Sequence, residues 1–221
     1  MDTNLHANQI DQLIDRLSPL WADPRERGLL AKMVQALDDR YGLSGKMALE
    51  PGVADILAQM TGRLAGAFGN LSGLRGLKIL DIACGSNSSR APAAVHVNTP
   101  FGKLTLGRPP KGYTALFEPW FCRMLIELDA DPVGVDMGDL EREAFTHHRA
   151  DLGQPGALDF LPEHSFDALQ DSRLFGSPEF TAQFPRSADR LQVAREIRRQ
   201  ERRLLKPGGI LIHSDALDLV G

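Results

Sequence analysis

Four aspartates end, or directly follow, short apolar runs of the sequence: Asp81 in LKILDIA, Asp136 in PVGVD, Asp151 in RADL and Asp171 in FDALQD. Carboxylates in such positions can accept hydrogen bonds from ribose hydroxyls or from an exocyclic amine. Any one of them is explained about equally well as a helix cap or a solvated strand end. Four acids at one edge of a sheet are much harder to explain by capping, so the pattern predicts a ligand site there.

The loop after the first apolar run consists of the small residues Ala83, Cys84, Gly85, Ser86 and Asn87. Small residues let a backbone approach a ligand closely, and the amides at the start of a following helix favour negative or polar groups. The loop alone is a weak signal, because many α/β proteins contain a glycine in a strand-to-helix turn. The aspartates that end the other runs strengthen it.

The elements that position these residues form a repeating pattern. After residue 76, short apolar runs alternate with helical stretches near 118–129 and 186–205. Strands that alternate with helices pair in parallel through right-handed crossovers. The sequence therefore predicts a doubly wound, mostly parallel Rossmann-like α/β sheet, with the acids at its carboxyl edge.

A helical cap is predicted before the sheet, over residues 1–70. Apolar residues recur at helical spacing within 10–17. Asp23, Pro24 and Glu26 form a helix-start signal, and a third helix is predicted to begin at Pro51. We interpret the apolar stripes of these helices as packing surface rather than as a ligand site.

The ordered set of motifs resembles the class I S-adenosylmethionine-dependent methyltransferases. The resemblance runs from Leu77 to about Asp215. LDIACGSN is similar to that family's first motif, VGVDM to its second, RADL to its third, LPEHSFDALQD to its fourth and RRLLKPGGILIHSD to the segment entering the fifth strand. It implies that residues 71–221 form a domain that binds S-adenosyl-L-methionine.

The resemblance also implies a role for each matching residue. Asp81 and the backbone of Ala83, Cys84 and Gly85 would lie by the methionyl group, and Asp171 or Ser172 would lie near the reacting methyl. Asp136 would hold the ribose. Asp151 would accept a hydrogen bond from the adenine amine, and Met137 and Leu152 would flank the adenine ring. The chain departs from the family at Asn87, where a second glycine is usual. Asparagine tolerates left-handed backbone angles, so the turn is expected to survive.

A long insertion separates the first two motifs. Asp81 and Asp136 lie 55 positions apart, more than the roughly 20 expected for a strand-helix-strand unit of this type. We place the insertion at about 90–117, as a lid or substrate-recognition element or as an ordered loop without a catalytic role. Within it, KLTL and YTALF are predicted to pair across GRPPKG, with a flexible loop as the alternative. The next helix would begin near Glu118-Pro119.

The chain ends soon after the predicted fifth strand, where the family sheet usually continues. The sheet is therefore a shortened five-stranded version, or the insertion or a partner chain completes its edge. An uncovered edge strand invites pairing between subunits, so we expect that the protein can form a homodimer.

No residue can be assigned a catalytic role from the sequence. Methyl transfer from a sulfonium mainly needs alignment of donor and acceptor, and a base is needed only when the acceptor must lose a proton. The candidates are His147, His148, His164, His213, Tyr113 and Arg173. No Cys/His spacing suggests zinc, and the adjacent histidines should point to opposite faces of a strand.

Composition and charge limit the partners and the cellular location that we expect for the protein. The net charge is −4, which gives no general attraction to nucleic acid or anionic membranes, and the basic run at 195–206 has interleaved acids typical of a solvated helix face. No signal peptide or membrane span is evident, and the two cysteines are expected to be reduced packing residues, so we expect a cytoplasmic protein. We expect its substrate to be a small molecule. Two alternatives remain: a catalytically reduced methyltransferase-like binding module, and a nucleotide-dependent oxidoreductase, although GxGxxG is lacking.

Overall fold

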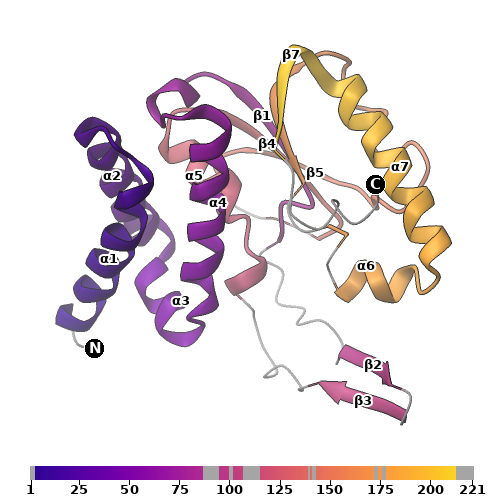
Figure 1. Ribbon diagram of the computed structural model, residues 1–221, viewed down its shortest axis with the longest axis horizontal. Coiled ribbons are helices and arrows are strands. Elements are labelled where there is room, and N and C mark those ends of the chain that lie inside the picture. Colours follow the sequence, from indigo (N-terminus) through magenta and orange to yellow (C-terminus); the bar gives the residue numbers. More distant parts are fainter. Residues whose placement is uncertain are drawn as a thin grey trace.

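A five-stranded parallel sheet in the order β5-β4-β1-β6-β7 forms the centre of the molecule (Figure 1). The computed structural model describes residues 3–86, 95–99, 102–106, 115–138, 140, 143–171, 174–175 and 178–212. The strands of this sheet are β1 (Lys78–Ile82), β4 (Asp131–Asp136), β5 (Thr146–Arg149), β6 (Phe166–Asp171) and β7 (Leu205–Ile212). The chain proceeds from β1 outward to β5 and then returns to β6 on the other side, so the winding reverses between β1 and β6.

Helices cover both faces of the sheet, which confirms the predicted doubly wound Rossmann-like class (Figure 1). α4 and α5 lie on one face and α7 on the other. The described α-helices are α1 (Thr3–Leu17), α2 (Pro24–Tyr41), α3 (Leu43–Leu49), α4 (Gly52–Phe68), α5 (Trp120–Glu127), α6 (Pro178–Gln183) and α7 (Ser187–Leu204). Among these helices, none has the length and apolar character needed to cross a bilayer.

Each face of the sheet has its own apolar core, because side chains alternate along a strand. Ile79 of β1 and Ala168 of β6 pack against the cap helices and α5. Leu80 and Leu169, one position further on, pack on the opposite face with Ile197 of α7. The apolar stripes predicted for the cap are buried in the first core, as Leu13, Leu17, Leu30, Met33, Leu37, Val53 and Leu57 show. The cap and one sheet face therefore share a single core.

The predicted start of α2 is confirmed, but Glu26 has another role than capping. The Asp23 carboxylate accepts a hydrogen bond of 2.8 Å from the Arg25 amide, and Pro24 is the first helical residue. The Glu26 carboxylate instead accepts from the amides of Leu71 and Ser72, at 2.5 and 3.0 Å. Burial would raise the pKa of Glu26, but these bonds and one from the Ser72 hydroxyl lower it below its usual value. Glu26 thus ties the start of α2 to the segment that enters the sheet.

The segments between the predicted helices differ from the sequence prediction at three points, one of which is the short helix α6, which was not predicted. α3 was not predicted, because its seven residues are too few for a helical period to stand out. In the insertion, KLTL lies in β3 (Gly102–Leu106), but its antiparallel partner is β2 (Val95–Thr99) rather than YTALF. Val95 and Val97 alternate with polar residues, which is the period expected of a strand. The last part of YTALF forms the 3₁₀ helix η3 (Ala115–Phe117) instead.

The β2–β3 hairpin forms a separate two-stranded sheet, so it does not extend the five-stranded sheet. Figure 1 shows the hairpin apart from the main sheet. This rules out, within the described residues, the alternative that the insertion completes the sheet edge. The helix after the insertion begins at Trp120 with Pro119 before it, as predicted.

Candidate functional site

The loop after β1 and the end of β4 meet at the carboxyl edge of the sheet. One Asp136 carboxylate oxygen accepts from the Gly85 amide at 3.1 Å, and the other accepts from the Gly138 amide at 2.8 Å. A Cβ on Gly138 would lie 2.4 Å from the Ser86 side chain, so the two loops are in direct contact. The structure therefore brings Asp136 and Gly85 together, as the strand-end pattern predicts.

Three amides of the first loop, those of Cys84, Gly85 and Ser86, have acceptors within the protein. Cys84 donates to the Val135 carbonyl at 3.2 Å, and Ser86 donates to the Phe117 carbonyl at 2.8 Å. With the Gly85 bond to Asp136, three consecutive amides are satisfied. Gly85 has φ +95°, and a Cβ there would lie 2.2 Å from the Phe117 carbonyl oxygen. Only glycine fits this position, and the Phe117 carbonyl covers it.

Asp81 supports this loop from below instead of facing the sheet edge. Its side chain is fully buried, and the Cys122 thiol of α5 donates to it at 3.7 Å. Burial raises the pKa of Cys122 well above its usual value. A hydrogen bond with Cys122 lowers the pKa of Cys84, but burial and the nearby Asp81 charge leave it raised. Both thiols therefore stay protonated, which agrees with the prediction that they are packing residues.

Asp151 lies at the same edge, two residues after the end of β5, which is the strand next to β4. The Ala150 amide donates to the Asp136 carbonyl at 2.9 Å, which places the two acids on neighbouring chain segments. The Asp151 carboxylate accepts from the Gly153 amide at 2.9 Å and from the Gln183 side chain of α6 at 3.3 Å. Burial would raise the pKa of Asp151, but a hydrogen bond from the Gln154 side chain, at 3.1 Å, and those from Gly153 and Gln183 lower it. Asp151 is therefore a carboxylate at neutral pH.

The two residues predicted to flank an adenine lie in different environments. Met137 is 53% exposed beside Asp136. Leu152 is only 7% exposed and packs in the core on the α7 face. The structure thus leaves Met137 available to a ligand and places Leu152 beneath the surface.

Asp171 does not join the other acids. It is fully buried on the face of α7, where its carboxylate lies 3.3 Å from the Arg198 guanidinium. Arg198 also pairs with the buried Glu201 carboxylate at 2.6 Å. Burial raises the pKa of Glu201 to about 7. Asp171 therefore belongs to an ion-pair cluster between β6 and α7 rather than to the carboxyl-edge group.

A buried charge network below the first loop was missed by the sequence analysis. Glu118 accepts from Lys46 of α3 at 2.6 Å and from Arg123 of α5. Arg123 also pairs with Glu143 at 2.7 Å, and its guanidinium lies 4.1 Å from the centre of the Tyr41 ring. The network joins the cap, α5 and the loop after β4. Its one sequence signal is a charged residue in the apolar run WFCRMLI.

The three catalytic candidates that the structure describes do not gather at the carboxyl edge. His164 precedes β6, and its Nδ1 lies 2.9 Å from the Leu205 carbonyl, at the amino edge of the sheet. His147 and His148 are successive residues of β5 and therefore point to opposite faces, as predicted. His213, Tyr113 and Arg173 lie outside the described residues, as does Asn87. Within the described ranges, no group of three or more His, Cys, Asp or Glu side chains could hold a metal ion.

No protein-family model matches the chain, and no curated protein matches it. The fold and its carboxyl edge therefore define the class, an α/β protein with a doubly wound Rossmann-like sheet.

Proposed function

We propose that this protein is an S-adenosylmethionine-dependent methyltransferase that acts on a small-molecule acceptor. The observation that carries the proposal is the Asp136 carboxylate at the end of β4, held 3.1 Å from the amide of the glycine loop after β1. In open α/β sheets, ligands bind outside the carboxyl ends of the strands, and an acid near this position holds a ribose. The order of motifs along the chain supports the same cofactor.

The residues at the edge fit the adenosine part of this cofactor. A carboxylate can accept about four hydrogen bonds, and Asp136 uses two of its sites on the Gly85 and Gly138 amides. The remaining lone pairs suit two ribose hydroxyls. Asp151 on the neighbouring segment already accepts from Gly153, Gln154 and Gln183, which leaves about one acceptor site for the adenine amine. The exposed Met137 suits the ring face.

The methionyl part does not fit the first loop as it stands. The amides of Cys84, Gly85 and Ser86 are already bound to acceptors in the protein. The Phe117 carbonyl occupies the space beside Gly85. A methionyl group at this loop would therefore have to displace that carbonyl. Asp81 and Asp171 would not touch it, because both are buried on the inner faces of the sheet.

When bound, S-adenosylmethionine supplies an activated methyl group, so the chain mainly has to bind, orient and exclude water. Asp136 and Asp151 would fix the adenosine, and no described side chain has the position of a base. The acceptor is unidentified. We further propose a cytoplasmic protein that pairs as a homodimer through an edge strand of its sheet, either β5 or β7.

Titration calorimetry with S-adenosylmethionine and its demethylated product tests the proposal. Replacing Asp136 by Ala should weaken binding by roughly 1–3 kcal/mol, because two ribose hydrogen bonds are lost. The matched control is Asp39→Ala, an exposed acid on α2 that should bind like the wild type. Thermal unfolding of each variant separates lost binding from lost folding. Affinity of about 1 mM or weaker for both compounds would contradict the proposal.

A binding module without catalysis is a second candidate, favoured by the Phe117 carbonyl that covers Gly85. A cofactor-bound structure separates the two. An open cavity beside the methyl supports the enzyme, whereas a side chain of the insertion in that cavity supports the module. The oxidoreductase alternative predicts a fluorescence change of NADH or NADPH on binding, and no change would exclude it.

A further inference from the structure

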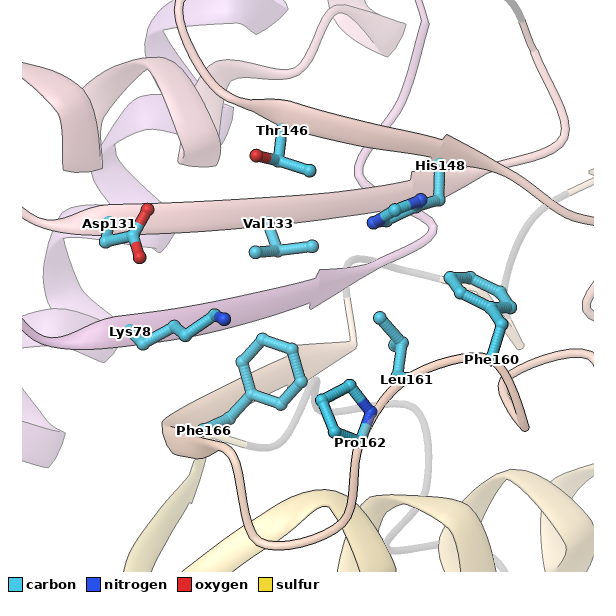
Figure 2. A pocket seen from close by; sticks show the side chains of 9 residues that line it. All are labelled: Lys78, Asp131, Val133, Thr146, His148, Phe160, Leu161, Pro162 and Phe166. Carbon is cyan, nitrogen blue, oxygen red and sulfur yellow. The ribbon is translucent and has the colours of Figure 1, made fainter.

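A hollow lies at the amino edge of the sheet, opposite the edge that carries Asp136. Its volume is about 230 Å³. The first residues of four strands line it, from β1, β4, β5 and β6, together with the segment before β6 (Figure 2). It is separate from the carboxyl-edge group of Asp136 and Asp151, so the inference below does not rest on the proposed methyltransferase activity.

One end of the hollow carries two opposite charges that are not paired with each other. Lys78 and Asp131 are register partners at the starts of β1 and β4. Among the described residues, neither side chain forms an ion pair. The Lys78 ammonium lies 5.4 Å from the centre of the Phe166 ring, and in the part of the chain that the structure describes it donates no hydrogen bond. Figure 2 shows both charged groups at the same end of the hollow.

The other end of the hollow is aromatic. The ring centres of His148 and Phe160 lie 4.8 Å apart, and Phe160 is 51% exposed despite its size. Figure 2 shows these two rings away from Lys78 and Asp131. Flat apolar groups favour offset or tilted contacts with such rings. The hollow therefore offers a cation and an anion at one end and an aromatic surface at the other.

We propose that this hollow binds a free α-amino acid with a single aromatic ring. The ligand carboxylate would meet Lys78, its ammonium would meet Asp131, and its ring would lie against Phe160 and His148. A volume of about 230 Å³ equals about eight liquid waters at roughly 30 Å³ each, which suits one ring and its backbone group. It is below the range of about 300–1,000 Å³ common for larger ligands.

Titration of the ¹⁵N-labelled full chain with L-phenylalanine, followed by NMR, tests this inference. The amide signals of Thr146 and His148 should shift in a saturable way, while those of Gly85 and Gly138 stay in place. 3-Phenylpropionate lacks the ammonium and phenethylamine lacks the carboxylate, so each should bind about tenfold more weakly. Shifts confined to Gly85 and Gly138, or no saturation by about 10 mM phenylalanine, would overturn the proposal.

Variants assign the contacts to particular side chains. Lys78→Met and Asp131→Asn should each weaken phenylalanine binding about tenfold, and Phe160→Ala should weaken it as well. Lys32→Met removes an exposed lysine on α2 and should change nothing. Equal affinity of wild type and Lys78→Met would reject the site. Titration of the same variants with S-adenosylmethionine keeps the two proposals distinguishable, because these substitutions are at the far edge.

Discussion

Two residues of the first loop adopt left-handed backbone angles, but only one of them is a glycine. Gly85 has φ +95° and no room for a Cβ, whereas Ala83 has φ +57° with a methyl group in place. A left-handed conformation costs a residue other than glycine about 1–2 kcal/mol. The loop therefore holds strain at Ala83 that the surrounding contacts must offset.

Substitutions at these two positions should have opposite effects on stability. Gly85→Ala should lower the free energy of unfolding by about 2 kcal/mol or more, because the new Cβ meets the Phe117 carbonyl. Ala83→Gly should raise it by up to about 1 kcal/mol, since glycine accepts this φ without strain. Urea unfolding followed by circular dichroism measures both changes.

The control for these substitutions is Gly66→Ala in α4, where a Cβ would meet nothing within 4 Å. A helix interior favours alanine over glycine by about 0.5–1 kcal/mol, so this variant should be more stable. Destabilisation by Ala83→Gly would contradict the proposal that Ala83 holds strain.

At the scale of elements, β6 and α7 are joined by a buried cluster of charges. The cluster lies between the strand and the side of the helix that faces it. It consists of Asp171 of β6 and of Arg198 and Glu201 of α7. Burial raises the pKa of Glu201 from 4.5 to about 7, and the charge of Asp171 adds to this rise. The positive charges of Arg198 and Arg202 lower the pKa, but they do not outweigh the effect of burial. A protonated Glu201 is thus favoured in the folded chain below neutral pH.

This pKa predicts a pH dependence of stability with a definite sign. The folded chain holds the Glu201 proton more tightly than the unfolded chain does. The contribution of this proton to the free energy of unfolding is therefore complete below pH 4.5 and is lost as the pH rises to about 7. The loss is at most about 3 kcal/mol. Urea unfolding at several pH values should show this fall in the wild type and a smaller one in Glu201→Gln.

Glu196→Gln, on the same helix, is the matched control. Hydrogen bonds from Arg199 and Gln200 lower the pKa of Glu196, so titration of this carboxylate cannot decrease the free energy of unfolding between pH 4.5 and 7. If wild type and Glu201→Gln show the same pH profile, Glu201 is not the titrating group.

At the scale of the whole molecule, the helical cap and one face of the sheet share one apolar core. Trp21 of the cap is 2% exposed, and Trp120 of α5 is fully buried in the same core. The charge network of Glu118, Arg123 and Lys46 also spans the junction. Such an arrangement favours cooperative unfolding of cap and sheet together.

The two tryptophans of the chain permit a direct measurement. Trp120→Phe leaves Trp21 as a reporter of the cap, and Trp21→Phe leaves Trp120 as a reporter of the helix on the sheet. The fluorescence transitions of the two variants in urea should each coincide with the circular dichroism transition of the same variant. A cap transition at clearly lower urea would mean that the cap unfolds alone.

Local patterns in the sequence were sufficient for the class of fold and for part of the site. Alternating strands and helices predicted the doubly wound sheet, and the end of the PVGVD run placed Asp136 beside the loop of Gly85. These features depend on backbone geometry within one element and on the rule that parallel strands end at one edge. Neither requires knowledge of distant contacts.

The tertiary structure was needed wherever a side chain finds its partner far along the chain. Asp136 and Asp171 both end apolar runs, yet one meets a loop amide and the other meets Arg198 of α7. Lys46 and Glu118 pair across 72 positions, and Lys78 and Asp131 become neighbours only through strand pairing. A local period indicates the face that a side chain occupies, but strand register and helix packing decide which distant residue it meets there.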